Sequence, residues 1–294
     1  MAYKNPAQRP VDMVIACRAV DLPILRLAVS SLRRFTACRE IHVFTARSSL
    51  SKFRRVLGDR VRLHNEDQAI PGMTLAELKR LNLPGFPKAA GWYFQQLLKY
   101  SYASQNESDD YYLIWDADTI PLRPLEFFDS EGRMLFTVAE EKHQSYFSNY
   151  QRLLRETPVR EFSFIAQHII VQKSILRRLL GQIEMVHPGG ESWAWKIMRN
   201  LEGTDTNLFS EYETYGHFVK AHYPERAVFL RRAWLRDGSQ RLLRLPRAKD
   251  LQRLSAEYDF VSFESRHRPL RKAWRSLRDW WAKMALHPFR TAGR

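Results

Sequence analysis

The sequence predicts an α/β protein with a mostly parallel central sheet. Three observations lead to this fold class. Short apolar runs alternate with amphipathic segments in the first half of the chain, as β-α-β units require. The strongest run, Tyr111–Trp115, is continuously apolar, as in strands buried on both faces. The 294 residues, 45% of them hydrophobic and 27% charged, can bury the core that such a sheet needs.

The first half supplies the predicted parallel strands and the helices between them. Val11–Cys17 is the first apolar run. A helix capped by Asp21, with Pro23 in its first turn, follows to about Phe35. Beyond it we expect strands at Ile41–Thr45, Val61–His64 and Tyr111–Trp115, and helices at Ser48–Leu57, Leu75–Leu81 and Trp92–Ala103. The segment Pro71–Pro87, rich in proline and glycine, is expected to be a loop around the short helix.

The second half has a less regular pattern, which favours a mixed arrangement of strands. The strands expected there are Met134–Val138, Phe162–Val171, Ala227–Leu230 and Phe260–Phe263. The helices expected there are Tyr146–Leu154, Ile175–Gln182, Trp193–Arg199 and Ser210–His222.

Charge is unevenly distributed along the chain. Of the net +15, residues 231–294 contribute +11, with 17 Lys and Arg against 6 Asp and Glu. Such a field favours polyanions: anionic lipid, nucleic acid or phosphate-bearing substrates. Cys17 and Cys38 form neither a disulfide framework nor a CxxC pair, so a reducing compartment is expected. Because no long apolar segment occurs, we expect neither a signal peptide nor a membrane span.

The triplet Asp116-Ala117-Asp118 directly follows the strongest predicted strand. In an extended segment, residues i and i+2 point to one side, so the two carboxylates are expected to converge. Ligands of open α/β sheets bind beyond the carboxyl ends of strands. Two carboxylates there repel each other unless a cation lies between them, and their hard oxygens suit Mg²⁺ or Mn²⁺. We therefore expect a metal site that neutralises a diphosphate leaving group. A solvated turn is the alternative.

A phosphatase is a second interpretation of the same residues. D-x-D-x-T after an apolar strand is also the first motif of haloacid-dehalogenase-like phosphatases, in which Asp116 would be the nucleophile. That motif usually lies on the first strand of its domain, with a later acidic pair, often within G-D-x-x-x-D. Here three β-α units precede it and no G-D-x-x-x-D follows, which favours the metal site.

The segment from Lys88 to Phe128 combines an aromatic-rich helix, a short linker, and an apolar strand that ends in D-x-D-T and a Pro-Leu pair. In this it resembles GT-A glycosyltransferases, and it is most similar to a group of uncharacterised bacterial GT-A-like proteins. The resemblance is specific over this segment, looser over residues 11–63 and 161–267, and absent from the tail. It implies a GT-A-like, Rossmann-type α/β/α sandwich.

The resemblance also implies an activity and a domain organisation. Residues 1–265 would form one catalytic domain, with a nucleotide-binding half to about residue 125 and an acceptor half from about residue 126. A metal-dependent enzyme of the hexosyltransferase type would transfer a sugar from a nucleoside-diphosphate donor, foremost a UDP-sugar, to a hydroxyl of a glycan or lipid-linked acceptor. The metal would be Mn²⁺ or Mg²⁺. Cytoplasmic synthesis of bacterial surface polysaccharide or lipopolysaccharide is the implied setting.

Donor-binding positions follow from the same resemblance. In such enzymes the end of the first strand lies beside the nucleotide base, and the helix before D-x-D lends polar residues to the donor. The implied donor-binding residues are Ala16, Cys17 and Arg18, then Lys88, Trp92 and Gln95, and Asp116 itself. Alternatively, Trp92 belongs to the apolar face of its helix and Gln95 is solvated.

Two acidic residues stand at a predicted helix start. Ser210 and Glu213 match the S-x-x-E capping box, in which Glu213 has a structural role. The resemblance implies a catalytic role, because inverting enzymes place an acidic residue here to deprotonate the acceptor hydroxyl. Glu211 is the first candidate for this base and Glu213 the second. A retaining enzyme would not need the base, and the sequence leaves the stereochemistry open.

A histidine ligand to the metal is a further implication. The candidates are His217, His222 and His267, and His267 is the first choice because it follows the strand FVSFESR. The segment IAQHIIVQ corresponds to a donor-sugar or acceptor pocket, for which Gln167 and His168 are candidates. Strand alternation sends these two side chains to opposite faces, so only one is expected to face the cleft.

Residues 266–294 are a basic, amphipathic tail. At helical spacing Trp274, Leu277, Trp281 and Met284 fall on one side, and most of the basic residues fall elsewhere. A tryptophan-bearing face flanked by arginines suits an anionic membrane, here the inner face of the cytoplasmic membrane. A terminal helix packed on the catalytic domain is the alternative. A non-catalytic, basic membrane-surface-binding protein is the non-enzymatic interpretation. No nucleic-acid-binding motif occurs, so nucleic acid is not an expected partner.

Overall fold

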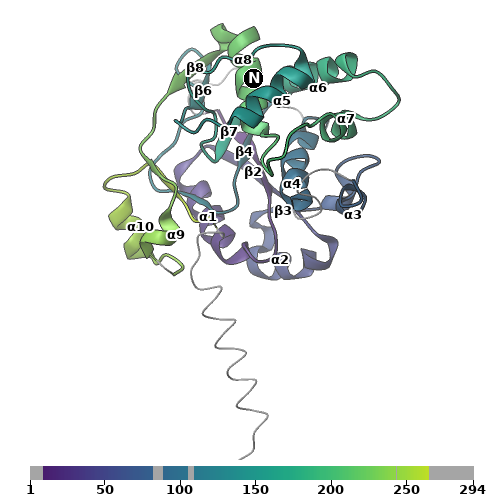
Figure 1. Ribbon diagram of the computed structural model, residues 1–294. Coiled ribbons are helices and arrows are strands. Elements are labelled where there is room, and N and C mark those ends of the chain that lie inside the picture. The colour runs from purple at the N-terminus through teal and green to yellow at the C-terminus, as the bar shows by residue number, and fades with distance from the viewer. Residues whose placement is uncertain (1–8, 82–88, 105–108, 243, 265–294) are drawn as a thin grey trace, which may run out of the picture.

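The computed structural model describes residues 9–81, 89–104, 109–242 and 244–264. At its centre is a five-stranded sheet in the order β3-β2-β1-β4-β7 (Figure 1). The strands are β1 (Val11–Ala16), β2 (Cys38–Thr45), β3 (Arg62–Asn65), β4 (Tyr111–Trp115) and β7 (His168–Gln172). The first four are parallel, and β7 runs antiparallel to β4. The predicted α/β class with a mostly parallel central sheet is confirmed.

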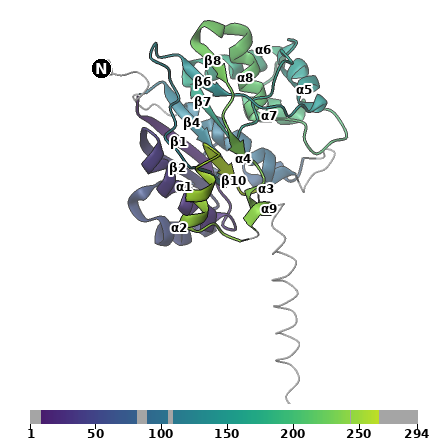
Figure 2. The same cartoon turned by 90° about the vertical axis from the view of Figure 1, so that its left-hand side faces the viewer.

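Helices cover both faces of this sheet. The described helices are α1 (Leu22–Phe35), α2 (Leu50–Leu57), α3 (Leu75–Leu78), α4 (Ala90–Ser101), α5 (Gln144–Leu154), α6 (Lys173–Val186), α7 (Trp193–Arg199), α8 (Glu211–His222), α9 (Gly238–Leu242) and α10 (Ala248–Leu254), of which α9 packs on β10 instead. The chain runs from β1 to β3 in one direction and returns to place β4 on the other side of β1. Because β-α-β crossovers are right-handed, α1 and α2 lie on one face and α4 on the other (Figure 2).

The reversal of strand order between β1 and β4 determines where a ligand can bind. In open α/β sheets, the strands on either side of such a reversal send their connections to opposite faces, which leaves a crevice at their carboxyl ends. Ala16 ends β1 and Trp115 ends β4, so Asp116 lies at the edge of this crevice. In the described part of the chain, no helix is both long and apolar enough to cross a bilayer.

Two small sheets lie beside the central one. In the first, β10 (Phe260–Ser262) pairs with β5 (Thr119–Pro121) and β9 (Trp234–Leu235), and in the second, β6 (Met134–Thr137) pairs with β8 (Ala227–Leu230). The β5–β10 pairing brings the end of the described chain beside the acidic triplet, where Phe263 N–H donates to Asp118 O at 2.9 Å. The amino-acid pattern does not predict β5, β9, α9 or α10, because such short segments carry little periodicity.

The predicted strand Phe162–Val171 is wrong in its first half. Regular pairing with β4 begins only at His168, opposite Trp115. Upstream, Ser163 exchanges two backbone hydrogen bonds with Ala139, and Gln167 has a φ of +64°. A residue in the left-handed region cannot continue an extended strand. The chain therefore turns sharply just before β7.

The predicted cap of the first helix is also only partly correct. Asp21 does precede α1, with Pro23 in the first turn, but its carboxylate makes no capping hydrogen bond. The Asp21 carboxylate instead forms an ion pair with Arg18 at 3.1 Å. The side chain of Asp21 therefore belongs to the crevice edge rather than to the helix end.

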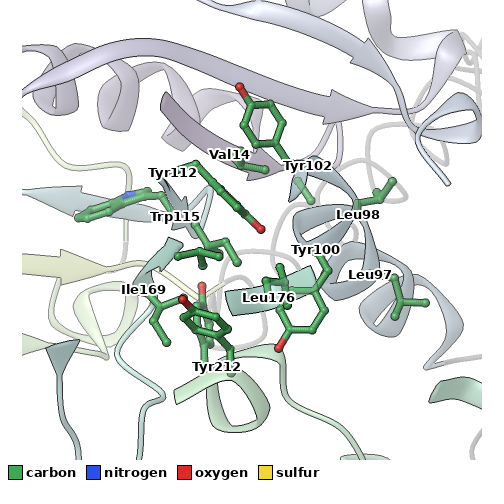
Figure 3. Packing of buried hydrophobic residues seen from close by; sticks show 14 of the residues in the cluster. Val14, Leu97, Leu98, Tyr100, Tyr102, Tyr112, Trp115, Ile169, Leu176 and Tyr212 are labelled. Carbon is green, nitrogen blue, oxygen red and sulfur yellow. The ribbon is translucent and has the colours of Figure 1, made fainter. Parts of the chain in front are cut away.

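Buried tyrosines join the elements that carry the site, as Figure 3 shows for the core between β4, α4 and α8. Tyr112 on β4 donates through its hydroxyl to Lys99 O at 3.0 Å, and Tyr100 on α4 donates to Glu211 O at 2.6 Å. Such rings each bury about 150–250 Å² of surface, and their hydroxyls must find partners when buried. These bonds fix α4 against β4 and α8, and so position Lys99 and Glu211.

Gly216 allows α8 to lie close to the loop before β7. A Cβ atom at this position would be 2.2 Å from Cγ of Phe164, closer than any tolerated contact. The absence of a side chain therefore lets the helix pack directly on the Phe164 ring, and this contact helps to hold the start of α8 at the crevice.

Candidate functional site

A cleft of about 620 Å³ opens at the carboxyl ends of β1 and β4. Its walls come from the end of β1, from α4, from the turn after β4, from the loops before α5, β7 and α8, and from the segments after β9 and β10. The charged and polar residues among those that line it include Arg18, Asp21, Gln95, Gln96, Lys99, Asp116, Asp118, Glu141, His143, Gln167, Ser210, Glu211, Arg236 and Glu264. The cleft thus lies where the strand order reverses.

Asp116 and Asp118 both line the cleft, but they lie in a turn rather than in an extended segment. Asp116 N–H donates to Gln167 O at 2.9 Å, and Thr119 N–H donates back to Asp116 O at 3.1 Å. Such an i+3 to i hydrogen bond is that of a β-turn. The extended geometry used to predict convergence is therefore wrong. Both side chains face the cleft because the turn lies at its floor.

A buried lysine joins the two halves of the site. The ammonium group of Lys99, on α4, contacts Oδ1 of Asp116 and lies 2.7 Å from Oε1 of Glu211, on α8. Tyr212 donates through its hydroxyl to the same Asp116 oxygen at 2.8 Å. Lys99 and Glu211 are both buried. Side chains separated by more than a hundred residues in sequence therefore form one ion cluster at the cleft floor.

Burial and charge act in opposite directions on the groups of this cluster. Burial by itself would lower the pKa of Lys99, but the carboxylates of Asp116 and Glu211 outweigh it and raise that pKa. Burial raises the pKa of Glu211, and the negative charge of Asp116 adds to the rise, whereas Lys99 opposes it. Burial likewise raises the pKa of the Tyr212 hydroxyl. Lys99 therefore stays a cation, and Tyr212 stays a neutral hydrogen-bond donor.

The two acidic residues at the start of α8 have different surroundings. Glu211 faces the cleft, and its backbone N–H donates to Gln96 Oε1 at 3.0 Å. The carboxylate of Glu213 instead accepts hydrogen bonds from Ser163 Oγ (2.5 Å) and Phe164 N (3.1 Å). Glu213 is not among the described residues that line the cleft. It therefore holds the loop before β7, whereas Glu211 is the acid within reach of a ligand.

The expected capping box at this helix is half formed. Ser210 Oγ accepts the hydrogen bond of Glu213 N–H at 3.3 Å, as a capping residue should. The reciprocal bond, from Ser210 N–H to the Glu213 carboxylate, is not formed in the described structure, because that carboxylate bonds to the loop before β7.

The other sequence-predicted residues divide into three groups. Those that line the cleft are Ala16, Arg18, Trp92, Gln95 and Gln167. Cys17 and His168 are buried and are not among its described lining residues. Lys88, His267 and the tail 266–294 lie outside the described residues. Trp92 is 39% exposed at the cleft wall, so it is not a core residue of its helix.

Cys17 and His168 have clear structural surroundings. Burial raises the pKa of the Cys17 thiol well above its usual range, so the group stays neutral. His168 stacks on Trp115 at 4.9 Å between ring centroids, and its Nε2 lies 3.1 Å from Thr137 Oγ1. Of the neighbours Gln167 and His168, only Gln167 lines the cleft, whereas His168 is buried in the core. The cause is the left-handed turn at Gln167 and not the strand alternation used in the prediction, because Gln167 lies before β7.

A second ion cluster lines the cleft and was missed in the sequence. Arg236 lies 2.7 Å from Oε1 of Glu264 and also contacts Glu141, which lies 2.5 Å from Nε2 of His143. Together the lining residues provide six carboxylates but only three Lys or Arg side chains. The cleft is thus acidic in a protein whose net charge is +15. A phosphate-bearing ligand would be repelled here unless a cation accompanied it.

The donor set of the cleft fits a hard divalent cation. Lys99 and Tyr212 both contact Oδ1 of Asp116, so its second oxygen is available to a ligand, and Asp118 lies on the same wall. Mg²⁺ and Mn²⁺ are commonly held by one or two carboxylates while water and substrate phosphates fill the other positions. In the described structure no third histidine, cysteine or acidic residue joins Asp116 and Asp118 at ligand distance.

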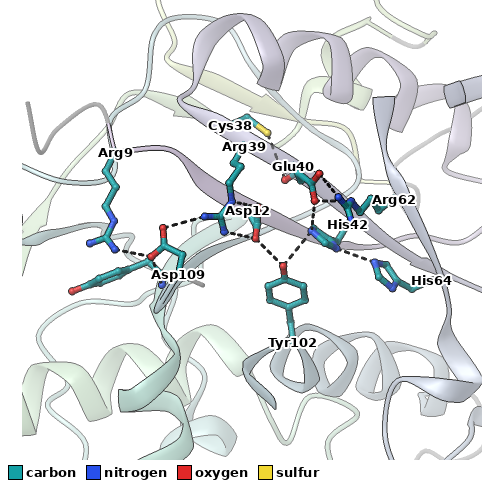
Figure 4. Close-up of polar contacts among 11 residues, drawn as sticks. Arg9, Asp12, Cys38, Arg39, Glu40, His42, Arg62, His64, Tyr102 and Asp109 are labelled. Atoms are coloured by element: carbon teal, nitrogen blue, oxygen red, sulfur yellow. Dashed lines mark hydrogen bonds and ion pairs between the residues drawn. The ribbon is translucent and has the colours of Figure 1, made fainter. Parts of the chain in front are cut away.

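One three-residue group in the described chain does have donor atoms within 4.8 Å of one another, namely Asp12, Glu40 and His42. Figure 4 shows the polar contacts of this group. Its residues come from the amino-terminal part of β1 and from β2, whereas the cleft lies at the carboxyl ends of β1 and β4. Arg39 bonds to both oxygens of Asp12, at 2.8 and 2.5 Å, and these bonds lower the pKa of Asp12 although burial raises it. Because the guanidinium group of Arg39 already binds the Asp12 carboxylate, we interpret this group as a structural ion network.

Lys99 could have been found from the sequence. It is the only charged residue of α4, and it follows Gln95 and Gln96 by four and three positions, so the three share one helix face. A single lysine within an otherwise apolar and aromatic helix needs an anionic partner if it is buried. The sequence does not reveal which carboxylates provide it.

The chain belongs to the family described as "Family of unknown function (DUF6492)", whose model matches residues 10–247. No curated protein matches its sequence.

Similar solved structures include mouse xyloside xylosyltransferase 1 in its apo form, with 12% identity and a TM-score of 0.49 over 88% of this chain and 99% of that one. The galactosyltransferase LgtC in complex with donor and acceptor sugar analogs is 12% identical, with a TM-score of 0.44 over 96% and 98%. The bifunctional glycosyltransferase WbbM in its apo form is 9% identical, with a TM-score of 0.42 over 90% of this chain and 47% of that one. At identities and TM-scores this low, neither the substrate nor the mechanism of these proteins can be assigned to this chain.

Proposed function

We propose that the chain is a metal-dependent glycosyltransferase that moves a sugar from a nucleoside-diphosphate donor to a hydroxyl of a glycan or lipid-linked acceptor. The observation that carries the proposal is the pair Asp116 and Asp118 at the floor of an acidic cleft, where the strand order reverses. The resemblance of the segment around this pair to GT-A glycosyltransferases supports the same activity.

Asp116 and Asp118 would hold Mn²⁺ or Mg²⁺. When bound, such an ion neutralises the charge that develops on a diphosphate as its bond to the sugar carbon breaks. Lys99 holds Asp116 in place through an ion pair at the cleft floor. Asp118 is held by its backbone carbonyl, which accepts from Phe263 N–H at 2.9 Å. The protein thus fixes both ligands before a donor arrives, which limits reorganisation during the reaction.

Glu211 is the proposed general base for transfer with inversion. Its carboxylate would take the proton of the acceptor hydroxyl, the hydroxyl oxygen would bond to the sugar carbon, and the nucleoside diphosphate would leave with the bonding electrons. Lys99, 2.7 Å from Oε1, orients the carboxylate and keeps a cation beside it. Burial raises the pKa of Glu211, which makes its carboxylate a stronger base.

The nucleotide would lie between the end of β1 and α4, beside Ala16, Arg18, Trp92 and Gln95. The exposed Trp92 ring offers an apolar face for the base of a UDP-sugar. The basic tail 266–294 would draw the enzyme to an anionic membrane surface in the cytoplasm that presents a lipid-linked acceptor.

A thermal-shift screen of UDP- and GDP-sugars, with and without Mn²⁺, tests the proposal. We expect at least one nucleotide sugar to raise Tm only when Mn²⁺ is present, and the same compound to be hydrolysed slowly without an acceptor. No shift with any nucleotide sugar would contradict the proposal. Incubation with a phosphate ester, followed by mass spectrometry, tests the phosphatase: a phosphorylated Asp116 would replace the proposed function with that one.

A further inference from the structure

Gln167 has an unusual backbone conformation beside the metal-site turn. Its φ is +64°, and of the described non-glycine residues only Arg155, with a φ of +58°, is also positive. A side chain in this left-handed region contacts its own backbone unfavourably. Such residues persist where the surrounding structure holds them, and they are frequent at functional sites.

The surrounding hydrogen bonds hold Gln167 in this conformation. Its carbonyl oxygen accepts from Asp116 N–H at 2.9 Å, and the next residue, His168, begins the pairing of β7 with β4. One backbone position therefore connects the turn of the proposed metal site to the adjacent strand. The turn at Gln167 also brings its side chain to the cleft instead of to a face of the sheet.

The amide of Gln167 has no hydrogen-bond partner among the described residues, although the residue is only 5% exposed. The amide is not among the fully buried unpaired groups of the described structure, so it opens into the cleft rather than into the core. A ligand in the cleft would meet this amide, because it lines the cleft together with Asp116. The amide carries both an N–H donor and a carbonyl acceptor, which together match a sugar hydroxyl.

We propose that Gln167 is a specificity-determining residue whose strained backbone directs its amide onto a hydroxyl of the transferred sugar. This inference rests on the proposed function and adds the group that recognises the sugar. A phosphate oxygen is a weaker match, because it only accepts hydrogen bonds and would lie against the acidic wall of the cleft.

Arg155 provides a matched control for the backbone effect. It is also left-handed, but it is exposed at the end of α5, where its N–H donates to Gln151 O at 2.8 Å. Such a conformation is common at helix ends and serves the helix alone. Arg155 is not among the described lining residues of the cleft. Glycine at either position relieves the left-handed strain, but only at Gln167 does it remove a ligand contact.

The experiment compares Gln167→Gly, Gln167→Ala and Arg155→Gly with the wild type. Tm and Mn²⁺-dependent turnover are measured for UDP-glucose and UDP-galactose, which differ at one hydroxyl, and for any other nucleotide sugar found in the screen. Both glycine variants should keep or slightly raise Tm. Arg155→Gly should keep wild-type turnover. Gln167→Gly and Gln167→Ala should each lose at least about tenfold in kcat/KM for the preferred donor and discriminate less between donors.

Each outcome decides a separate question. Wild-type turnover with unchanged donor discrimination in Gln167→Ala would overturn the inference and leave the proposed function standing. A Tm loss in Gln167→Gly, with activity falling only as far as folding does, would show a structural role and overturn it as well. If the wild type neither binds nor turns over any nucleotide sugar, the proposed function fails and the inference fails with it.

Discussion

The ammonium group of Lys99 on α4 lies 2.7 Å from Oε1 of Glu211 on α8 and contacts Asp116 after β4 at the same time. One buried cation thus lies between the proposed base and the proposed metal ligand. Without it, two carboxylates would meet at the cleft floor with no compensating charge between them. The position of Lys99 therefore links the stability of the fold to the chemistry of the site.

Replacing Lys99 should strongly destabilise the protein. Lys99→Met leaves Asp116 and Glu211 facing each other, and removing one partner of a buried ion pair typically costs about 3–5 kcal/mol. Urea unfolding followed by circular dichroism measures the loss. Lys196→Met is a matched control, because Lys196 is also buried but, among the described residues, its ammonium group bonds only to a backbone carbonyl, Glu184 O at 3.2 Å.

Adding Glu211→Gln to the Lys99 variant should restore part of the lost stability. The double variant Lys99→Met/Glu211→Gln removes one of the two facing charges, so the two effects should not add. Additive losses in this cycle would show that Lys99 and Glu211 do not interact energetically.

Neutralising each of the two acidic residues of α8 should change a different property, kcat for one and Tm for the other. Glu211→Gln should lower kcat about 10²–10⁴-fold, as expected for loss of a general base, with little change in Mn²⁺-dependent donor binding. Glu213→Gln should lower Tm, because its carboxylate holds Ser163 and Phe164, and should leave kcat of the folded enzyme nearly intact. Steady-state kinetics with thermal melts separates the two, and equal kcat losses would contradict the assignment.

His168 makes the stability of the fold depend on pH. Burial, with a smaller contribution from Arg232, lowers the pKa of His168 from 6.5 to about 3 in the folded protein. Because the pKa of His168 is lower in the folded than in the unfolded protein, the neutral residue contributes fully to stability above about pH 6.5. This contribution is lost as the pH falls toward 3, since the unfolded chain then binds a proton that the folded protein does not. From pH 7 to pH 5 the loss should be about 2 kcal/mol.

The variant His168→Gln tests this origin. Glutamine keeps a polar partner for Thr137 but does not titrate, so urea unfolding of the variant should lose less stability between pH 7 and pH 5 than the wild type loses. If both proteins lose the same amount, another group causes the acid sensitivity.

The elements that position the site could be predicted from the sequence wherever their apolar residues form a clear strand or helix pattern. Tyr111–Trp115 and the helix before it form β4 and α4 within one or two residues of the prediction. The triplet after β4 lies at the sheet edge, because a buried parallel strand must end near a crevice. The resemblance to GT-A enzymes points to Glu211 at a helix start, and in the structure this residue lines the same cleft as Asp116.

What the sequence could not show depends on long-range contacts. Lys99 meets Glu211 across 112 positions, and no local pattern indicates that pairing. The strand Phe162–Val171 is apolar enough to be extended throughout, but the bonds of Ser163 to Ala139 and the turn at Gln167 override that preference. Arg236 and Glu141 lie 95 positions apart in the chain, so no local pattern indicates their ion pair.

The most direct test of the central claim is calorimetric titration of UDP into the wild type and into Asp118→Asn, each with and without Mn²⁺. Asp129→Asn is the control, because Asp129 pairs with Arg133 away from the cleft. We expect the wild type and Asp129→Asn to bind UDP only with Mn²⁺, and Asp118→Asn to lose at least about tenfold in that affinity. Equal Mn²⁺-dependent affinity in all three proteins, or UDP binding that ignores Mn²⁺, would contradict a metal site at Asp116 and Asp118.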